Sequence, residues 1–288
     1  MQRRRRHMTA THHVLGISGG KDSAALAIYM RENHPDLDIK YFFTDTGEEL
    51  PEVYEFLGKL EGLLGRKIHY LNPERDFKFW LRHNGNFLPS PQTRWCTIKL
   101  KLHPFKNWVN PWLAAGDKVI SYVAIRADEE HRDGMQSHHK NLTIKLPFRD
   151  HGIIKEGVLD ILEASGIGLP KYYDWRSRSG CTFCFFQQKI EWVGLRERHP
   201  EAFENAKKME KSALENGTPF TWSQNEPLSE LEKPERIAQI KEDFKKRLQR
   251  ELANRRLNPL RVCNSENLDL DDLYLDDEGG GACLVCHK

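Results

Sequence analysis

The sequence predicts an α/β fold built on a parallel sheet, because short apolar runs alternate with segments of helical spacing. The runs at 13–17, 39–43 and 68–71 have the length of strands. Between the second and third runs, residues 51–64 show helical spacing and begin with a proline, which is favoured in the first turn of a helix. Strands that are separated by helices run parallel, so we expect a βαβαβ unit.

Two further apolar runs extend this sheet. Residues 119–125 are predicted to form a fourth strand, and residues 142–146 a fifth strand at one edge. Parallel sheets are covered on both faces, so helices are expected on each side.

A helical lobe is expected after the sheet domain. Residues 187–256 are heavily charged and have helical spacing, with breaks at Pro200, at 217–219 and at Pro234. Beyond Cys263 the chain is acidic and Gly-rich, which is typical of disorder. The chain is thus divided into four parts. They are a basic leader (1–11), a sheet domain that carries the main motifs (12–186), a helical lobe (187–262) and an acidic cysteine-containing tail (263–288).

Composition bears on location and on partners. No run of about 18 apolar residues is present, and no apolar stretch of signal-peptide length follows the N-terminal arginines, so a cytoplasmic protein without membrane contact is expected. The formal net charge is +2, but seven acidic residues lie within 266–278, which leaves +9 on the remainder. A basic body suits a polyanionic partner, ATP, or a solvated surface equally well.

A Gly-rich turn follows the first predicted strand and opens an apolar helix. Such a turn presents backbone N–H groups and the positive end of the helix to a phosphate. Its two glycines permit close approach, its lysine adds positive charge, its serines donate hydrogen bonds, and its aspartate organises Mg²⁺ or the loop itself. The turn is not a Walker A loop, because that spacing requires glycine at Leu15. We call it the phosphate loop: Ser18, Gly19, Gly20, Lys21, Asp22 and Ser23.

The phosphate loop resembles the PP-loop of ATP pyrophosphatases, S-G-G-x-D-S, in the lysine-containing version found in the phosphoadenosine phosphosulfate (PAPS) reductase family. Two further segments carry the resemblance. Residues 44–47, followed by Pro51 and Glu52, are similar to the Asp-Thr-Gly element of the family. Residues 125–132 resemble its Gly-x-Arg-x-x-Glu-Ser segment, with Ala124 as one departure and Glu130 as another.

This resemblance implies an adenine nucleotide alpha hydrolase-like fold of the PP-loop (HUP) type that binds ATP and Mg²⁺. Besides the phosphate loop, the nucleotide site it implies contains Asp45, Thr46, Gly47, Arg126 and Arg132. The catalytic residues it implies are Lys21, Asp22 and Arg126. The arginines would stabilise phosphate charge through their planar guanidinium groups, although salt bridges with nearby acids are an alternative role.

The cysteines indicate a metal site. Six cysteines in a cytosolic chain favour metal binding or catalysis over disulfides, and a lone Cys-x-x-Cys is compatible with zinc, an iron–sulfur cluster or redox exchange. In adenylyl-sulfate reductases and in the DNA-phosphorothioation members of the PAPS reductase family, a [4Fe–4S] cluster is bound by one cysteine and a later Gly-Cys-x-x-Cys. Cys96, Cys181 and Cys184 match these positions.

The fourth ligand of such a cluster is open. Trp95 stands where adenylyl-sulfate reductases have a second cysteine. Cys263 is the favoured fourth ligand, and a tail cysteine (Cys283 or Cys286) or a non-protein sulfide is the alternative. Zinc remains an alternative to the cluster.

From residue 13 to about 184 the resemblance is greatest to the ATP pyrophosphatases of DNA phosphorothioation. It implies that a DNA backbone phosphate is adenylated and then receives sulfur from the persulfide of a cysteine desulfurase partner. Cationic residues would hold the strand, unless they form an ordinary solvated surface. They are Arg94, Lys99, Lys101, Lys106, Arg176 and Arg178.

Three other functions compete with this one. A tRNA-thiolating enzyme would share the adenylating mechanism. A PAPS or adenylyl-sulfate reductase would need a terminal Glu-Cys-Gly-x-His, which the frame around Cys286 and His287 lacks. A non-catalytic protein that senses nucleotides through a structural cluster is the third. DNA is favoured over tRNA as the acceptor, and self-association is left open.

Overall fold

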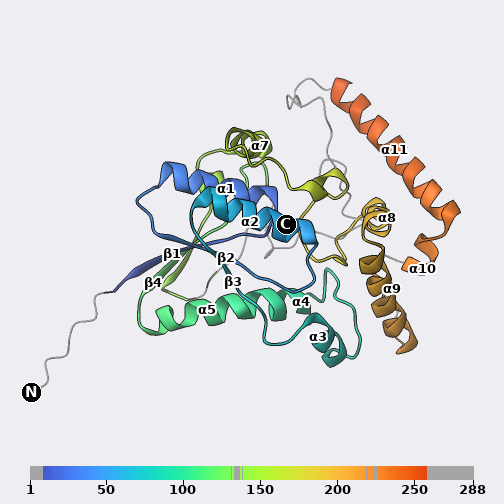
Figure 1. The fold of residues 1–288 in the computed structure, drawn as a ribbon, viewed down its shortest axis with the longest axis horizontal. Coiled ribbons are helices and arrows are strands. Elements are labelled where there is room, and N and C mark those ends of the chain that lie inside the picture. The colour runs from blue at the N-terminus through green and yellow to red at the C-terminus, as the bar shows by residue number, and fades with distance from the viewer. Residues whose placement is uncertain are drawn as a thin grey trace, which may run out of the picture.

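The computed structural model describes residues 9–130, 132, 137, 139–217, 220–223 and 226–257, without the side chains of 254–257. Its centre is a five-stranded sheet in the order β3-β2-β1-β4-β5, in which all four neighbouring pairs run parallel (Figure 1). The predicted parallel α/β fold and the edge position of the fifth strand are therefore confirmed. The strands are β1 (Thr11–Gly16), β2 (Ile39–Phe43), β3 (Ile68–Tyr70), β4 (Lys118–Tyr122) and β5 (Leu142–Lys145).

Helices cover both faces of the sheet, as predicted. Helices α1 (Lys21–Asn33), α2 (Pro51–Leu64) and α7 (Lys155–Ala164) lie on one face, and α5 (His103–Ala114) lies on the other (Figure 1). Side chains alternate between these layers because successive residues of a strand point to opposite faces. In β1, Leu15 belongs to the larger core shared with α1, α2 and α7, whereas Val14 belongs to the smaller core beneath α5.

Shorter elements connect these layers. Trp95 and Cys96 lie within a short helix that continues into a π-helical turn and then into α5. The shorter elements are α3 (Phe77–His83), α4 (Trp95–Thr97), the π-helix η1 (Ile98–Leu102), α6 (Pro147–Asp150) and the 3₁₀ helix η2 (Lys171–Asp174).

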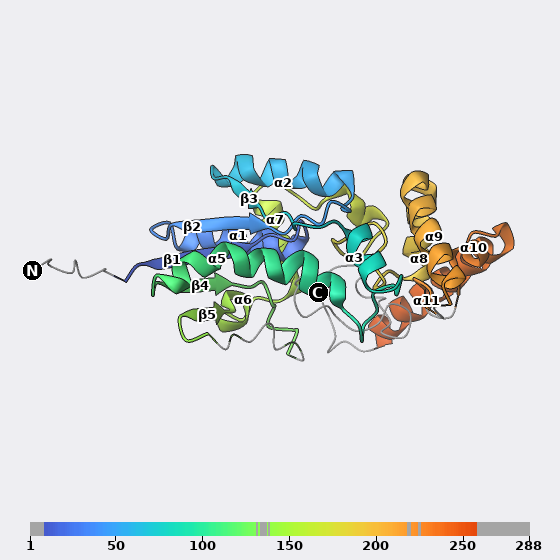
Figure 2. The ribbon, with the colours of Figure 1, turned by 90° about the horizontal axis from the view of Figure 1, so that it is seen from below.

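The helical lobe lies beyond the carboxyl ends of the strands, as both views of the molecule show (Figures 1 and 2). Proline lacks an N–H group and fits the first helical turn, so it ends one helix and begins the next. The predicted breaks at Pro200 and Pro234 are indeed the first residues of two helices. The helices of the lobe are α8 (Lys189–Arg198), α9 (Pro200–Glu215), α10 (Leu228–Leu231) and α11 (Pro234–Leu257).

Aromatic rings join the lobe to the sheet domain. The ring centroid of Phe77 in α3 lies 4.5 Å from that of Phe183, and Phe183 lies 5.2 Å from Trp222. Trp222 lies 6.4 Å from Trp192 in α8. One continuous apolar core therefore runs from the strands into the lobe.

Two expectations concern other parts of the chain. Most of the basic leader, the acidic tail and its cysteines, including Cys263, lie outside the described residues. Within the described residues, no helix combines the length and the apolar character needed to cross a membrane.

Candidate functional site

The order of the strands creates a switch point at β1. From β1 the chain builds β2 and β3 on one side of the sheet, and later β4 and β5 on the other. In open α/β sheets, ligands bind beyond the carboxyl ends of the strands where the order reverses in this way. The phosphate loop follows β1 and the Arg126 segment follows β4, so two of the predicted motifs meet at this position.

Hydroxyl groups hold the phosphate loop together from within. The backbone N–H of Ser18 donates to Ser23 Oγ over 3.0 Å, and the two serine hydroxyls share a further 3.0 Å hydrogen bond. Gly19 has a φ of +77°, and a Cβ at this position would meet Val53 Cγ1 at 2.6 Å. Only glycine satisfies both conditions, because positive φ strains other residues.

Two tyrosines outside the motif support the loop. Tyr172 donates its hydroxyl hydrogen to the carbonyl of Gly19 over 2.8 Å, and its burial raises its pKa. The backbone N–H of Lys21 donates to the Tyr173 hydroxyl over 3.2 Å, and Lys21 Nζ lies 4.8 Å from the centre of the Tyr173 ring. Sequence reasoning missed both tyrosines, because no motif marks them and they follow the loop by about 150 positions.

Arg126 lies against the aspartate of the phosphate loop. Its Nη1 donates to Asp22 Oδ1 over 2.9 Å, and its Nε and Nη2 donate to the two carboxylate oxygens of Asp128 over 2.9 and 3.1 Å. Burial disfavours the charged guanidinium, but the neighbouring carboxylates, Asp22 foremost, raise the pKa of Arg126. The predicted anion binder is thus paired with acids, as the salt-bridge alternative expected, but the Asp22 pair is buried rather than on the surface.

Arg132 is also held by an acid. Its Nη1 donates to Glu129 Oε1 over 2.7 Å, and only 3% of its side chain is exposed. Arg149 Nη2 donates to the backbone carbonyls of Glu129 and Arg132 over 2.8 and 2.7 Å. These contacts hold the segment after β4 in place.

The loop after β2 is held by its aspartate. Asp45 Oδ1 accepts hydrogen bonds from the Gly47 N–H over 2.9 Å and from the Tyr54 hydroxyl over 2.7 Å. Burial, then the hydrogen bond to Asp45, raises the pKa of Tyr54. Thr46 is buried in the same loop. The predicted Asp-Thr-Gly element therefore lies at the carboxyl end of β2, beside the phosphate loop after β1.

The loop that contains Cys181 and Cys184, residues 177–186, which we call the cysteine loop, contacts both of these elements. The N–H of Thr182 donates to the Glu48 carbonyl over 2.7 Å, and Thr46 Oγ1 shares a 3.3 Å hydrogen bond with Cys181 Sγ. Ser179 Oγ donates to Ser18 Oγ over 3.3 Å. Three motifs that are far apart in the sequence thus converge at one end of the sheet.

The three central cysteines lie partly buried against the same apolar core. Burial raises the pKa of the Cys181 and Cys184 thiols, and the guanidinium of Arg176 opposes this shift at Cys184. Within the part of the chain that the structure describes, no three His, Cys, Asp or Glu side chains are grouped as metal ligands.

Two of the cationic residues expected to hold a strand are buried. Arg176 is fully buried, and its Nη2 donates to the Cys181 carbonyl over 2.7 Å. Arg178 is 5% exposed, and its guanidinium lies 5.4 Å from the centre of the Phe186 ring. In this arrangement both arginines position the cysteine loop, whereas a strand would need exposed cations.

Comparisons with known proteins bear on the same region. Residues 12–141 match the family model of the phosphoadenosine phosphosulfate reductase domain. The uncharacterized protein MJ0066 of Methanocaldococcus jannaschii is 32% identical over 197 residues, which cover 66% of this chain and 40% of that protein. An uncharacterized 37.8 kDa protein of Escherichia phage 186 is 26% identical over 253 residues, or 67% of this chain and 72% of that protein.

A solved structure is also similar. The phosphate complex of phosphoadenylyl-sulfate (PAPS) reductase from Candida auris is 12% identical and has a TM-score of 0.45, over 59% of this chain and 81% of that chain. The chain spans less than half the length of the M. jannaschii protein, so the comparison covers only part of that relative.

The family match begins in β1 and ends just before β5. It therefore contains the phosphate loop, the loop after β2 and the Arg126 segment, whereas the cysteine loop and the helical lobe lie outside it. The motifs and the family model therefore both show that residues 12–141 are similar to the phosphoadenosine phosphosulfate reductase domain.

Proposed function

We propose that the chain binds ATP through the phosphate loop and cleaves it between the α- and β-phosphates, which transfers AMP to an acceptor. The arrangement at the switch point carries this proposal. The phosphate loop there presents the N-terminal end of α1, and Arg126 holds the loop's Asp22. The positive charge of Arg126 offsets part of the repulsion between that aspartate and the phosphates.

The reaction moves one phosphoryl bond. An acceptor oxygen attacks the α-phosphorus and forms a new P–O bond while the bond between the α-phosphorus and the bridging oxygen breaks. Pyrophosphate leaves with that oxygen, and the loop amides and the Lys21 ammonium stabilise its charge. Mg²⁺ would enter with the phosphates as their counter-ion, since it is usually bound by substrate phosphates and few carboxylates.

Tyr173 would change partners when the nucleotide binds. Its hydroxyl accepts the hydrogen bond of the Lys21 N–H, which is one of the amides that a phosphate uses at a helix N-terminus. A phosphate oxygen that takes over this amide would replace the Tyr173 hydroxyl as its acceptor.

We further propose that this adenylation is a step of DNA phosphorothioation. In this proposal the adenylated DNA backbone accepts sulfur from a cysteine desulfurase partner, and Cys96, Cys181, Cys184 and Cys263 hold a [4Fe–4S] cluster or, as the alternative, Zn²⁺. The proposal rests on the resemblance of the motifs. A tRNA acceptor would use the same chemistry, and a nucleotide sensor would bind ATP without cleaving it.

The family match favours one second candidate, a sulfonucleotide reductase, because the matched model describes a PAPS reductase domain. Such an enzyme would bind a sulfonucleotide in the phosphate loop and release sulfite. The two activities differ in substrate and in product, so one assay separates them.

The test incubates the purified chain with α-labelled ATP, alone and with DNA or tRNA, and with PAPS and a thiol reductant in parallel. We expect AMP and pyrophosphate, in amounts that rise with the correct nucleic acid. Lys21→Met keeps the length of the side chain and removes its charge, so it should lower turnover by about a hundredfold. Release of ADP and phosphate alone would refute the proposal, and release of sulfite would establish the reductase.

A further inference from the structure

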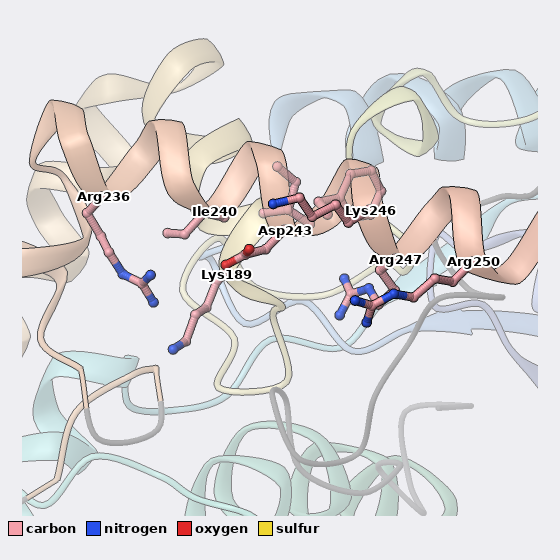
Figure 3. Close-up of a pocket in the computed structure, with 9 residues that line it drawn as sticks. Lys189, Arg236, Ile240, Asp243, Lys246, Arg247 and Arg250 are labelled. Atoms are coloured by element: carbon pink, nitrogen blue, oxygen red, sulfur yellow. The ribbon is translucent and has the colours of Figure 1, made fainter.

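A groove between α8 and α11 in the helical lobe is lined mainly by cations. It has a volume of about 370 Å³, and five of its nine lining residues are lysine or arginine, with a single acid, Asp243. Figure 3 shows the groove running along α11. The five cations are Lys189, Arg236, Lys246, Arg247 and Arg250.

Three arginines of α11 lie along one face of the helix. Arg236, Arg247 and Arg250 are separated by intervals close to whole helical turns, and Figure 3 shows their side chains on the side where Lys189 also lies. From Arg236 to Arg250 the helix rises by roughly 21 Å at 1.5 Å per residue. A row of this length reaches several successive phosphates of a nucleic acid strand.

The cations at the two ends of the groove contact different partners. At one end, Glu226 binds Lys189 over 2.8 Å and Arg236 over 2.5 Å, so these two cations already share a carboxylate. At the other end, Arg247 Nη2 donates to the neutral amide oxygen of Gln188 over 2.8 Å.

The lining between the cations is apolar. Ile190 and Ile240 line the groove, and Phe244 adds an aromatic ring that is half-buried. The guanidinium of Arg247 lies 5.5 Å from the centre of that ring. Cations interleaved with an aromatic ring suit a nucleic acid strand, because the phosphates bind the cations and a base stacks on the ring.

We propose that the groove between α8 and α11 binds the phosphodiester backbone of a single nucleic acid strand. The exposed cations that Arg176 and Arg178 cannot supply are present here, on helices outside the region matched by the family model. The charge and the aromatic ring specify a polyanion with bases, and the phosphodiester is common to DNA and RNA.

The groove is connected to the candidate site through the start of α8. Gln188, which binds Arg247, caps α8 together with Glu191, and the N–H of the preceding Gln187 donates to the Cys184 carbonyl over 3.0 Å. The cysteine loop in turn contacts the phosphate loop through Ser179. A strand in the groove would thus contact a helix that is joined to the phosphate loop through the cysteine loop.

The test measures binding in the absence of ATP, so it does not depend on the proposed activity. Fluorescence anisotropy is recorded with three labelled ligands: single-stranded DNA, RNA of the same sequence and duplex DNA. Each is about 20 nucleotides or base pairs long, which is longer than the stretch of single strand that one OB-fold covers. We expect single strands to bind more tightly than the duplex. The stronger of the two single strands identifies the natural source of the backbone.

A matched pair of variants locates the site. The double variant Lys246→Glu, Arg250→Glu reverses two charges in the groove. The control is the double variant Lys241→Glu, Lys245→Glu, which reverses two charges at the same spacing on α11 but outside the groove. The first pair should weaken binding by about tenfold or more, and the number of counterions released on binding, measured from the salt dependence of the affinity, should fall by about two. The second pair should change the affinity less than about threefold. Circular dichroism checks that α11 remains folded, and Lys246→Ala with Arg250→Ala provides a milder version.

Two results would overturn this inference. One is the absence of binding of all three nucleic acids to the unaltered chain at low salt, and the other is equal weakening by both charge-reversed pairs. If single strands bind through the groove but ATP is not cleaved between its α- and β-phosphates, the proposed function is refuted, whereas the inference that the groove binds nucleic acid is supported.

Discussion

Arg126 Nη1 lies 2.9 Å from Asp22 Oδ1, and this buried ion pair joins the loop after β1 to the segment after β4. The two residues are 104 positions apart in the chain. They meet because β1 and β4 are neighbours in the sheet, so the loops at their carboxyl ends are neighbours too. The pair therefore stabilises the geometry of the candidate nucleotide site as well as the fold.

Breaking this ion pair from one side should destabilise the protein. Arg126→Ala leaves Asp22 buried without its partner, which costs about 3 kcal/mol in the free energy of unfolding. Arg126→Lys restores a charge but not the planar fork that binds Asp22 and Asp128 together, so it should recover only part of the loss. Urea denaturation measures both, and a double-mutant cycle with Asp22→Asn should give a coupling energy above about 1 kcal/mol. Additive losses would contradict a direct interaction.

Gly20 is predicted to tolerate a larger side chain poorly for a spatial reason. A Cβ there would lie 2.8 Å from Ser179 Oγ and 3.3 Å from the Tyr173 hydroxyl. Gly20→Ala should therefore displace the cysteine loop and weaken ATP binding by about tenfold, measured by calorimetry. Adding Ser179→Ala removes the nearest atom and should restore much of the affinity.

The control for this prediction is Gly58→Ala in α2, where a Cβ would meet no atom within 4 Å. This variant should keep its ATP affinity and gain up to about 1 kcal/mol of stability, because alanine favours the helix. Equal affinity of the Gly20→Ala variant and the unaltered chain would show that the two loops are not in contact.

The metal content tests the proposed cluster. If Cys96, Cys181 and Cys184 bind iron with a fourth ligand, anaerobically purified protein should absorb broadly near about 400 nm and contain iron and sulfide. Cys181→Ser should remove most of both. Colourless protein with one zinc per chain would refute the cluster and support the zinc alternative.

Stability in acid should depend on Glu226. The hydrogen bond from Arg236 lowers the pKa of Glu226 to about 2 from an ordinary value of 4.5, although burial opposes the shift. A carboxylate with a lowered pKa adds stability that is fully present above the ordinary value and is lost as the pH falls through the lowered one. Glu226→Gln should therefore cost about 1–2 kcal/mol near neutral pH, and less as the pH falls below 4.5.

Denaturation of both proteins at several pH values between about 6 and 3 measures this difference. Glu210→Gln is a useful comparison, because burial raises the pKa of Glu210 and the pH dependence should then have the opposite sign. A cost of Glu226→Gln that stays constant down to the acid end would contradict the assignment.

The elements of the sheet domain were predictable where local signals agree. The second strand was predicted at 39–43 and the helix after it at 51–64, and the structure has both with these bounds. Proline begins this helix, and Gly65, with a φ of +64°, ends it. The fourth strand ends at Tyr122 rather than at residue 125, because pairing with β5 stops there and the chain turns toward Arg126.

The contacts of the candidate site were less predictable. The phosphate loop was found from its motif, but Tyr172 and Tyr173 carry no motif, and only the packing of η2 brings them to the loop. The burial of individual side chains was equally unpredictable, since nothing in the sequence around Arg176 indicates that this residue is fully buried. Contacts of this kind depend on long-range packing, which a single sequence does not reveal.

The chain of aromatic rings from Phe77 through Phe183 and Trp222 to Trp192 has a consequence for how the protein unfolds. The rings belong to one apolar core, so opening either part exposes apolar surface of the other. Both parts should therefore melt as a single cooperative unit. A weakened α9 would then loosen the phosphate loop without touching it.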